Sequence, residues 1–101
     1  MKATINVTDT MLKKSIIEAN KSVCELAKEF SFDYSEQEAG DKNAVSCRYP
    51  DGTVAKVTFY KAKTRGDKRI SITKLKHYAQ AGDVVTLKQS KEAIEILINE
   101  Q

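Results

Sequence analysis

The feature that most constrains the fold of this chain is a regular alternation of apolar and polar residues in its middle. Residues 45–49 and 55–59 place apolar side chains at every second position and polar side chains between them. A period of two is typical of a β-strand with one buried and one solvated face. Pro50-Asp51-Gly52, between the two segments, is a turn signal of the kind that closes antiparallel hairpins. The two segments are therefore predicted to form a half-buried β-hairpin.

Shorter runs elsewhere in the chain have the same strand-like character. Residues 4–7, 30–34, 70–72 and 84–87 combine apolar residues with alternation or with flanking turn residues. They are predicted as further strands of the same sheet. Together with the central hairpin, they indicate a sheet that is mainly antiparallel.

Helical spacing is strongest near the N-terminus. Between Leu12 and Phe30 the apolar residues recur every three or four positions, which predicts one amphipathic helix of roughly five turns. A brief helix is expected after Thr73, with Gly82 placed to end it. Residues 90–101 alternate like a strand but also fit a helical face, and we slightly favour a helix there.

A chain of 101 residues can close one hydrophobic core, so residues 1–101 are predicted to form a single domain. With 41% hydrophobic and 31% charged residues, the chain can fold without a metal or disulfide staple. The expected fold class is α+β: a curled antiparallel sheet or an open pseudobarrel with an N-terminal amphipathic helix.

The sequence has neither a long apolar run nor the basic-then-apolar layout of a secretory signal, so a cytoplasmic protein without membrane contact is expected. Cys24 and Cys47 are then expected to be free thiols. Two cysteines without a CxxC pair or several histidines do not make a zinc site, so neither a metal nor a cofactor is expected.

Charge is unevenly distributed along the chain. Residues 53–76 hold eight Lys or Arg and one Asp, a net charge of +7, although the whole chain carries only +3. The segments on either side each come to −2. Clustering of this kind is the electrostatic footprint of a protein that binds a polyanion.

The core of this cluster is the stretch KAKTRGDKRI, at residues 61–70. Because strands are expected to end at Tyr60 and to start at Ile70, residues 61–69 should project as a hairpin arm, a shape that fits the major groove of DNA. In that arm Asp67 could accept from a cytosine amino group or hold a neighbouring arginine in position. The predicted DNA-binding residues are Lys61, Lys63, Thr64, Arg65, Asp67, Lys68, Arg69, Lys74 and Lys76.

The segment TVAKVTFYKAKTRGDKRISI resembles the DNA-binding pseudobarrel domain that forms the effector domain of EcoRII-like restriction endonucleases, and more distantly that of plant transcription factors. The resemblance implies that residues 61–69 are the arm that clasps the major groove. It also implies that Arg65, Asp67, Lys68 and Arg69 occupy the positions that contact bases and backbone. Gly82-Asp83 matches a further feature of the family. The family's second arm precedes its first helix, where this chain has only a short segment.

No catalytic constellation is recognisable in the sequence. His77 is the only histidine, and no GxSxG, P-loop or HExxH motif occurs. The Pro-Asp pair at 50–51 lacks the acid-x-Lys that a metal-dependent nuclease needs further along, so a turn is the better interpretation. We therefore expect a binding protein, with no small-molecule substrate.

Double-stranded DNA is the partner that this reasoning favours, and three alternatives remain open. The basic arm could bind an acidic protein surface, for example in a phage- or plasmid-encoded inhibitor of a host complex. It could bind a folded RNA, although the strands offer few aromatic residues to stack on bases. It could also be a solvated hairpin tip whose lysines only keep a sheet edge soluble.

Overall fold

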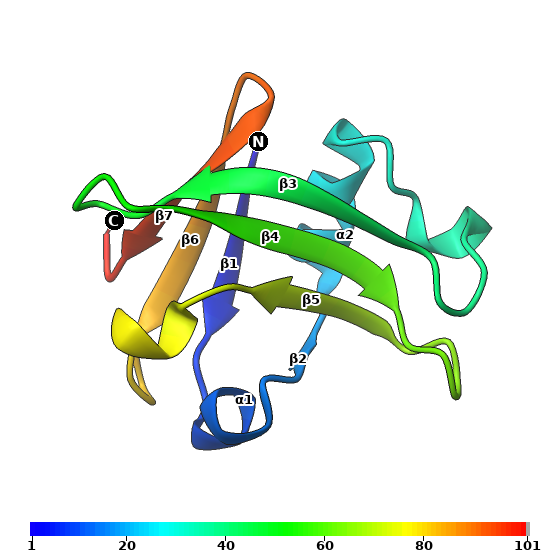
Figure 1. The fold of residues 1–101 in the computed structure, drawn as a ribbon, viewed down its shortest axis with the longest axis horizontal. Helices are drawn as coiled ribbons and strands as arrows, with labels where there is room; N and C mark the ends of the chain where they lie inside the picture. Colours follow the sequence, from blue (N-terminus) through cyan, green and yellow to red (C-terminus); the bar gives the residue numbers. More distant parts are fainter. Residues whose placement is uncertain (101) are drawn as a thin grey trace.

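The computed structural model describes residues 1–100 and builds them around one seven-stranded sheet (Figure 1). The elements are β1 (Lys2–Asn6), α1 (Asp9–Lys14), β2 (Ile17–Glu18), α2 (Lys21–Glu29), η1 (Tyr34–Glu36), β3 (Lys42–Arg48), β4 (Val54–Lys61), β5 (Lys68–Ile72), η2 (Leu75–His77), β6 (Val84–Ser90) and β7 (Ala93–Ile98), where η denotes a short 3-10 helix.

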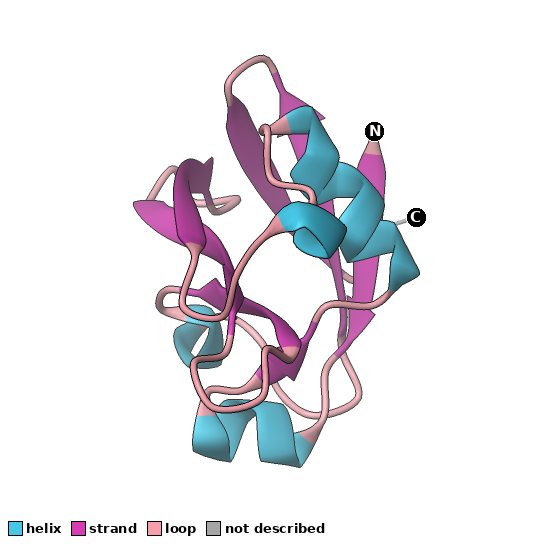
Figure 2. Ribbon diagram, turned by 90° about the vertical axis from the view of Figure 1, so that its right-hand side faces the viewer, coloured by secondary structure: helices cyan, strands magenta, loops and turns pink. Residues whose placement is uncertain are grey.

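The sheet is curled into a half-barrel, with strands in the order β1-β6-β7-β3-β4-β5-β2 (Figures 1 and 2). The α+β class and the curled sheet are confirmed, but the sheet is mixed instead of purely antiparallel. β7 lies parallel to β3, with Cys47 opposite Ile94 and Arg48 opposite Glu95. The parallel contact arises because the β6–β7 hairpin returns to the β3 edge after the chain has crossed over from β5. The sheet is therefore mixed.

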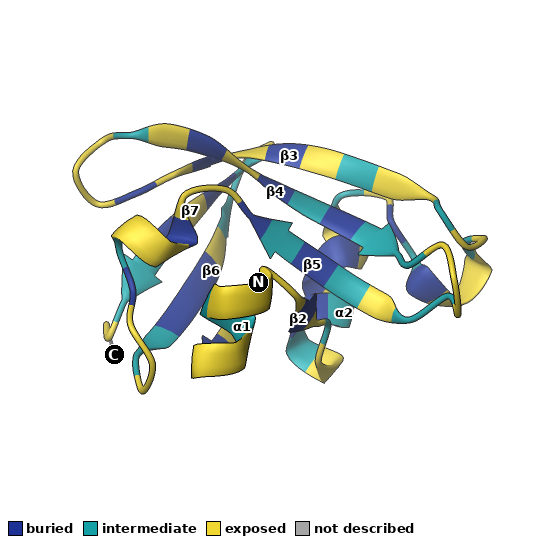
Figure 3. Cartoon of the chain, turned by 60° about the horizontal axis from the view of Figure 1, so that its bottom comes forward, coloured by how far each residue is buried: buried dark blue, intermediate teal, exposed yellow. Residues whose placement is uncertain are grey.

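Alternation along the strands produces the core, as predicted for the central hairpin. In β3 and β4 the residues Val45, Cys47, Val57 and Phe59 are buried, and the polar residues between them face outward (Figure 3). Helix α2 packs against the inner side of the curled sheet through its own buried residues, Val23, Leu26 and Ala27 (Figure 1). One continuous apolar core results.

Side chains join the two edges of the half-barrel. Asn20, which follows β2, donates from Nδ2 to the carbonyl oxygen of Thr4 in β1 (2.8 Å), and the Thr4 N–H donates to Ser22 Oγ (3.2 Å). The Oδ1 atom of Asn20 accepts from the Val23 N–H (3.0 Å) and so caps α2. The exposed edge of β1 is thereby partly covered, which satisfies backbone groups that an open edge would leave free.

The predicted five-turn helix between Leu12 and Phe30 is wrong, because the chain forms two short helices with a strand between them. Ser15 ends α1 in the left-handed conformation (φ 53°), and Asn20 starts α2. Between them Ile17 pairs with Ile70 in β5 and is buried. Ile16, which the helical pattern places on the apolar face, is exposed. Only α2 keeps an amphipathic helical face.

Two further expectations need correction. Residues 30–34 do not form a strand: Phe30 closes α2, and Asp33 caps η1 by accepting from the Ser35 N–H (3.0 Å). The C-terminal segment is strand β7 instead of a helix, because Ile94 and Ile96 both enter the core from alternate positions.

The buried side chain of Tyr49 ties a loop to the core. Tyr49 donates its hydroxyl to the carbonyl oxygen of Thr73 (2.6 Å) and stacks on Tyr78, with ring centroids 3.8 Å apart. Burial raises the pKa of the Tyr49 hydroxyl, which stays protonated and able to donate.

Cys24 and Cys47 are free thiols. Over residues 1–100 no helix has the length and apolarity needed to span a membrane.

Candidate nucleic-acid interface

The basic stretch forms the tip of the β4–β5 hairpin. The two strands pair as far as Lys61 opposite Lys68, and residues 62–67 make the turn at one end of the sheet (Figure 1). Two backbone hydrogen bonds close the turn: the Ala62 N–H donates to the Asp67 carbonyl oxygen (2.9 Å), and the Gly66 N–H donates to that of Ala62 (2.8 Å). Gly66 adopts φ 68°, a conformation in which a side chain would be strained. We call residues 61–69 the arm.

The base of the arm is held by the neighbouring loop. The Gly40 N–H donates to the Lys61 carbonyl oxygen (2.9 Å), and the Lys61 N–H donates to that of Asp41 (3.0 Å). The ammonium group of Lys61 donates to the Gln37 carbonyl oxygen (2.9 Å). From inside the core, the Tyr34 hydroxyl donates to the carbonyl oxygen of Arg69 (2.5 Å). The arm therefore rises from a fixed base.

Asp67 contacts Arg69 within the arm. Its Oδ2 lies 3.1 Å from Nη2 of Arg69, and the two side chains are 42% and 25% exposed. Of the two roles considered for Asp67, the structure thus contains the one in which it orients a neighbouring arginine. The Nε atom of Arg69 is buried without a hydrogen-bond partner among the described residues. One donor of this guanidinium is engaged, and the group is held close to the sheet.

The other predicted site residues divide into two groups. Lys63, Thr64, Arg65 and Lys68 are exposed on the arm. Lys74 and Lys76 are exposed too, but they lie around η2, beyond the far end of β5. Because β5 alone spans ~13 Å between its first and last residues, these two lysines are well separated from the arm. The structure brings the predicted residues of the arm together and leaves these two apart.

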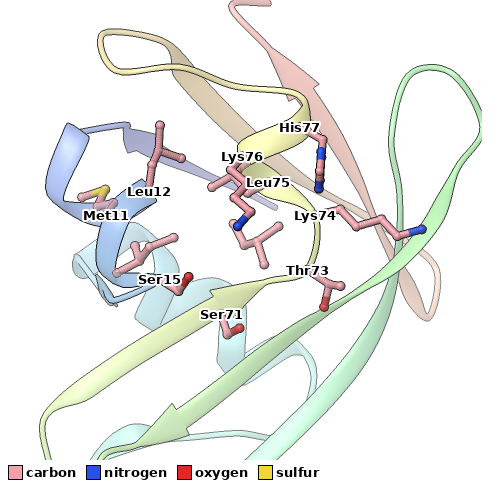
Figure 4. Close-up of a pocket in the computed structure, with 11 residues that line it drawn as sticks. Met11, Leu12, Ser15, Ser71, Thr73, Lys74, Leu75, Lys76 and His77 are labelled. Atoms are coloured by element: carbon pink, nitrogen blue, oxygen red, sulfur yellow. The ribbon is translucent and has the colours of Figure 1, made fainter.

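Lys74 and Lys76 border a separate pocket between α1, β5 and η2 (Figure 4). Its volume is about 260 Å³, and Met11, Leu12 and Leu75 contribute apolar surface to it. Ser15, Ser71 and Thr73 add hydroxyl groups to the lining. The pocket and the arm lie at different ends of β5, so they are separate features of the surface.

The strands beside the arm present a second basic surface, which the sequence reasoning missed. Alternate residues of β3, β4 and β5 point away from the core and carry cations or neutral groups, without a carboxylate among these described positions. The sequence signal for this surface is the type of residue at the polar positions of the alternating strands. A period of two shows that these positions are solvated, but not that they are basic. We call this surface the outer basic face; its residues are Lys42, Ala44, Ser46, Arg48, Val54, Lys56, Thr58, Tyr60, Arg69 and Ser71.

Within residues 1–100, no three His, Cys, Asp or Glu side chains gather closely enough to hold a metal ion. His77 lies exposed on η2. The arm and the outer basic face offer guanidinium, ammonium and hydroxyl donors.

Comparison with known proteins gives one informative similarity. The sequence matches no protein-family model and no curated protein. The fold is similar to that of the N-terminal domain of Helicobacter pylori LlaJI.R1, with a TM-score of 0.57 and 12% sequence identity. The match covers 97% of this chain and 86% of the other. At this identity the similarity concerns the fold, a curled half-barrel, and extends over nearly the whole chain.

Proposed function

We propose that this chain is a non-catalytic domain that binds double-stranded DNA in the cytoplasm and places the arm in the major groove. The single observation that carries the proposal is the hairpin tip itself. The arm carries five cations over residues 61–69 on a fixed base, and its one carboxylate pairs with one of its own arginines.

The shape of the arm supports a duplex partner. A two-stranded β-ribbon is one of the elements that the major groove of B-DNA admits. Arg65, on the turn, is exposed and free to reach a guanine edge, and Lys63 beside it is placed for a phosphate. Since the neighbouring loop and Tyr34 already hold the base of the arm, binding would order few backbone groups.

The presence of Asp67 argues against an arm that binds DNA by charge attraction alone. Phosphate repels a carboxylate, so Asp67 would weaken a contact made only with the DNA backbone. Paired with Arg69, it instead fixes the direction of a guanidinium, which is useful where a specific donor geometry must meet a base edge. The arm is therefore proposed to read sequence through Arg65, Asp67, Lys68 and Arg69.

The fold neighbour adds support of a coarser kind. LlaJI.R1 is a restriction-modification-related protein, and its N-terminal domain shares the curled half-barrel. The resemblance of residues 53–87 to the DNA-binding pseudobarrel domain is a separate reason for the same proposal. By analogy of fold, we propose that this chain too serves a system that recognises DNA.

A selection from randomised duplexes at two salt concentrations tests the proposal. The wild-type protein should enrich a defined sequence. Arg65→Ala should cost roughly 1–3 kcal/mol and relax the preference at one position, whereas Lys63→Ala should weaken all sequences alike and lower the salt slope by about one unit. The two variants control for each other, because each removes one cation from the same turn.

Two outcomes would overturn the proposal. One is a wild-type protein that binds no duplex even at low salt but captures a protein partner or a folded RNA. The other is unchanged duplex affinity after charge reversal at both Arg65 and Arg69, since the arm would then play no part in binding.

A further inference from the structure

The outer basic face forms an ordered row of side chains next to the arm. On its first rung Lys42, Tyr60 and Arg69 lie side by side on three neighbouring strands, because Tyr60 is in register with both other residues. On the next rung Thr58 lies between Ala44 and Ser71. Neighbouring strands are ~4.8 Å apart, so these groups form one compact donor surface.

This surface is hollowed at the foot of the arm. A shallow groove of about 490 Å³ opens there, and its lining includes Lys42, Tyr60 and Lys63 together with the hydroxyl-bearing Thr58 and Ser71. Its lining contains two ammonium groups beyond Lys61 and three hydroxyl groups, and no carboxylate from the described residues. Tyr60 is only half-buried there, so its ring and hydroxyl are accessible.

This half of the sheet carries cations without carboxylates on its outer face, as far as the border with β7, where Glu95 lies opposite Arg48. β3, β4 and β5 send Lys42, Arg48, Lys56 and Arg69 to the outer face, and none of these strands contains Asp or Glu. The outer positions of β6 and β7 mix signs instead, with Lys88 opposite Glu95. A general requirement for solubility would not separate the charges in this way.

We infer that the groove and the outer basic face hold the sugar–phosphate backbone of one DNA strand next to the arm. This inference rests on the proposed function and adds a site to it. Lys42 and Lys63 flank the groove as phosphate-binding cations, while Thr58, Ser71 and the Tyr60 hydroxyl donate to phosphate oxygens. The tyrosine ring lies against deoxyribose. The groove sets the register of the duplex, and the arm reads the bases.

The chemistry of the lining favours phosphate over bases as the ligand. Base edges are read most selectively by planar bidentate groups such as those of Arg, Asn and Gln, or by a carboxylate that accepts from cytosine, and none of these lines the groove as described. Ammonium and hydroxyl donors over a broad, open surface suit a repeated anion. Contacts of this kind should carry salt dependence and little sequence preference.

The test measures binding of a fluorescein-labelled mixed-sequence duplex by anisotropy as salt is raised. Lys42→Ala should make the slope of log affinity against log salt shallower by about one unit. When salt is raised roughly fourfold, the loss of affinity in the variant should then be about three- to fourfold smaller than in the wild type. Lys88→Ala is the matched control: it removes an exposed lysine from the outer side of the same sheet, far from the arm, and should leave the slope unchanged. Thermal melting confirms that both variants fold.

A second readout uses the absence of tryptophan from the sequence. Tyr60→Trp places a single indole in the groove, and its emission should change when the duplex is added. If Lys42→Ala behaves like Lys88→Ala and the indole does not respond, while Arg65→Ala still weakens binding, the groove inference is wrong and the proposed function stands. If the wild-type protein binds no duplex, both are wrong.

Discussion

Replacing Asp67 by Asn tests whether the carboxylate of the arm serves recognition. The change keeps the size of the side chain and removes its charge. The contact with Arg69 is 3.1 Å long and partly exposed, with side-chain exposures of 42% and 25%. A pair of this kind is worth roughly 0.2–1 kcal/mol of folding stability, so the variant should remain folded.

The effect on DNA binding should be larger and should depend on sequence. Loss of the negative charge makes the arm more basic, so affinity for mixed-sequence duplex should rise slightly. For the selected duplex, Arg69 would lose its fixed direction, and discrimination should fall by about 1–3 kcal/mol, or roughly 5- to 150-fold. The quantity to measure is the ratio of the two affinities, by competition between selected and mixed-sequence duplexes.

Asp9→Asn is the appropriate control, because it breaks another ion pair, Asp9 with Lys13 (3.0 Å), on α1 and away from the arm. That variant should leave the affinity ratio unchanged. The reasoning would be refuted if Asp67→Asn raised affinity for selected and mixed duplexes by the same factor, since Asp67 would then act only as a repulsive charge.

Two further predictions concern the scaffold. Asn20→Ala should destabilise the fold by about 1–2 kcal/mol in urea unfolding, because it removes both the cap of α2 and the bond to Thr4; Asn6→Ala, on an exposed outer position of β1, should cost much less. Three carboxyl groups have a lowered pKa because each accepts a hydrogen bond: Asp33 from the Ser35 hydroxyl, Asp51 from the Thr53 N–H and Asp83 from the Asn99 amide. The stability that these carboxylates contribute is complete above the unfolded pKa of ~3.9 and is lost as pH falls through the lower folded pKa values. The melting temperature should therefore drop below about pH 4, and this acid slope should be shallower in Asp83→Asn; an unchanged slope would contradict the assignment.

Local patterns predicted the central part of the fold well. The alternation in β3 and β4, with a turn of Pro50, Asp51 and Gly52 between them, is encoded within a few residues and survives in the structure. The helix predicted from Leu12 to Phe30 failed for a non-local reason. Ile17 is recruited to the sheet by Ile70, more than fifty positions away, and no periodicity in the N-terminal segment reports that partner.

The site, like the fold, was predictable where it depends on residues that are close in sequence. Residues 61–69 were placed correctly at a hairpin tip because a hairpin joins residues that are close in sequence. Lys74 and Lys76 were grouped with the arm for the same reason, and there closeness in sequence misled. A strand carries the chain away from the tip, so these lysines emerge at the opposite end of β5.

Lys42 shows how folding sorts charge that the sequence leaves mixed. It follows an acidic stretch containing Glu36, Glu38 and Asp41, and residues 1–52 carry a net charge of −2. In the structure those acids stay in η1 and in the loop, where Asp41 accepts from the Glu38 N–H (2.9 Å), while the pleat of β3 turns Lys42 and Arg48 to the outer basic face. Because side-chain direction in a strand is set by register, a shift of one residue would bury these cations and expose Val45 and Cys47. The same pairing that builds the core therefore fixes the position of the basic surface.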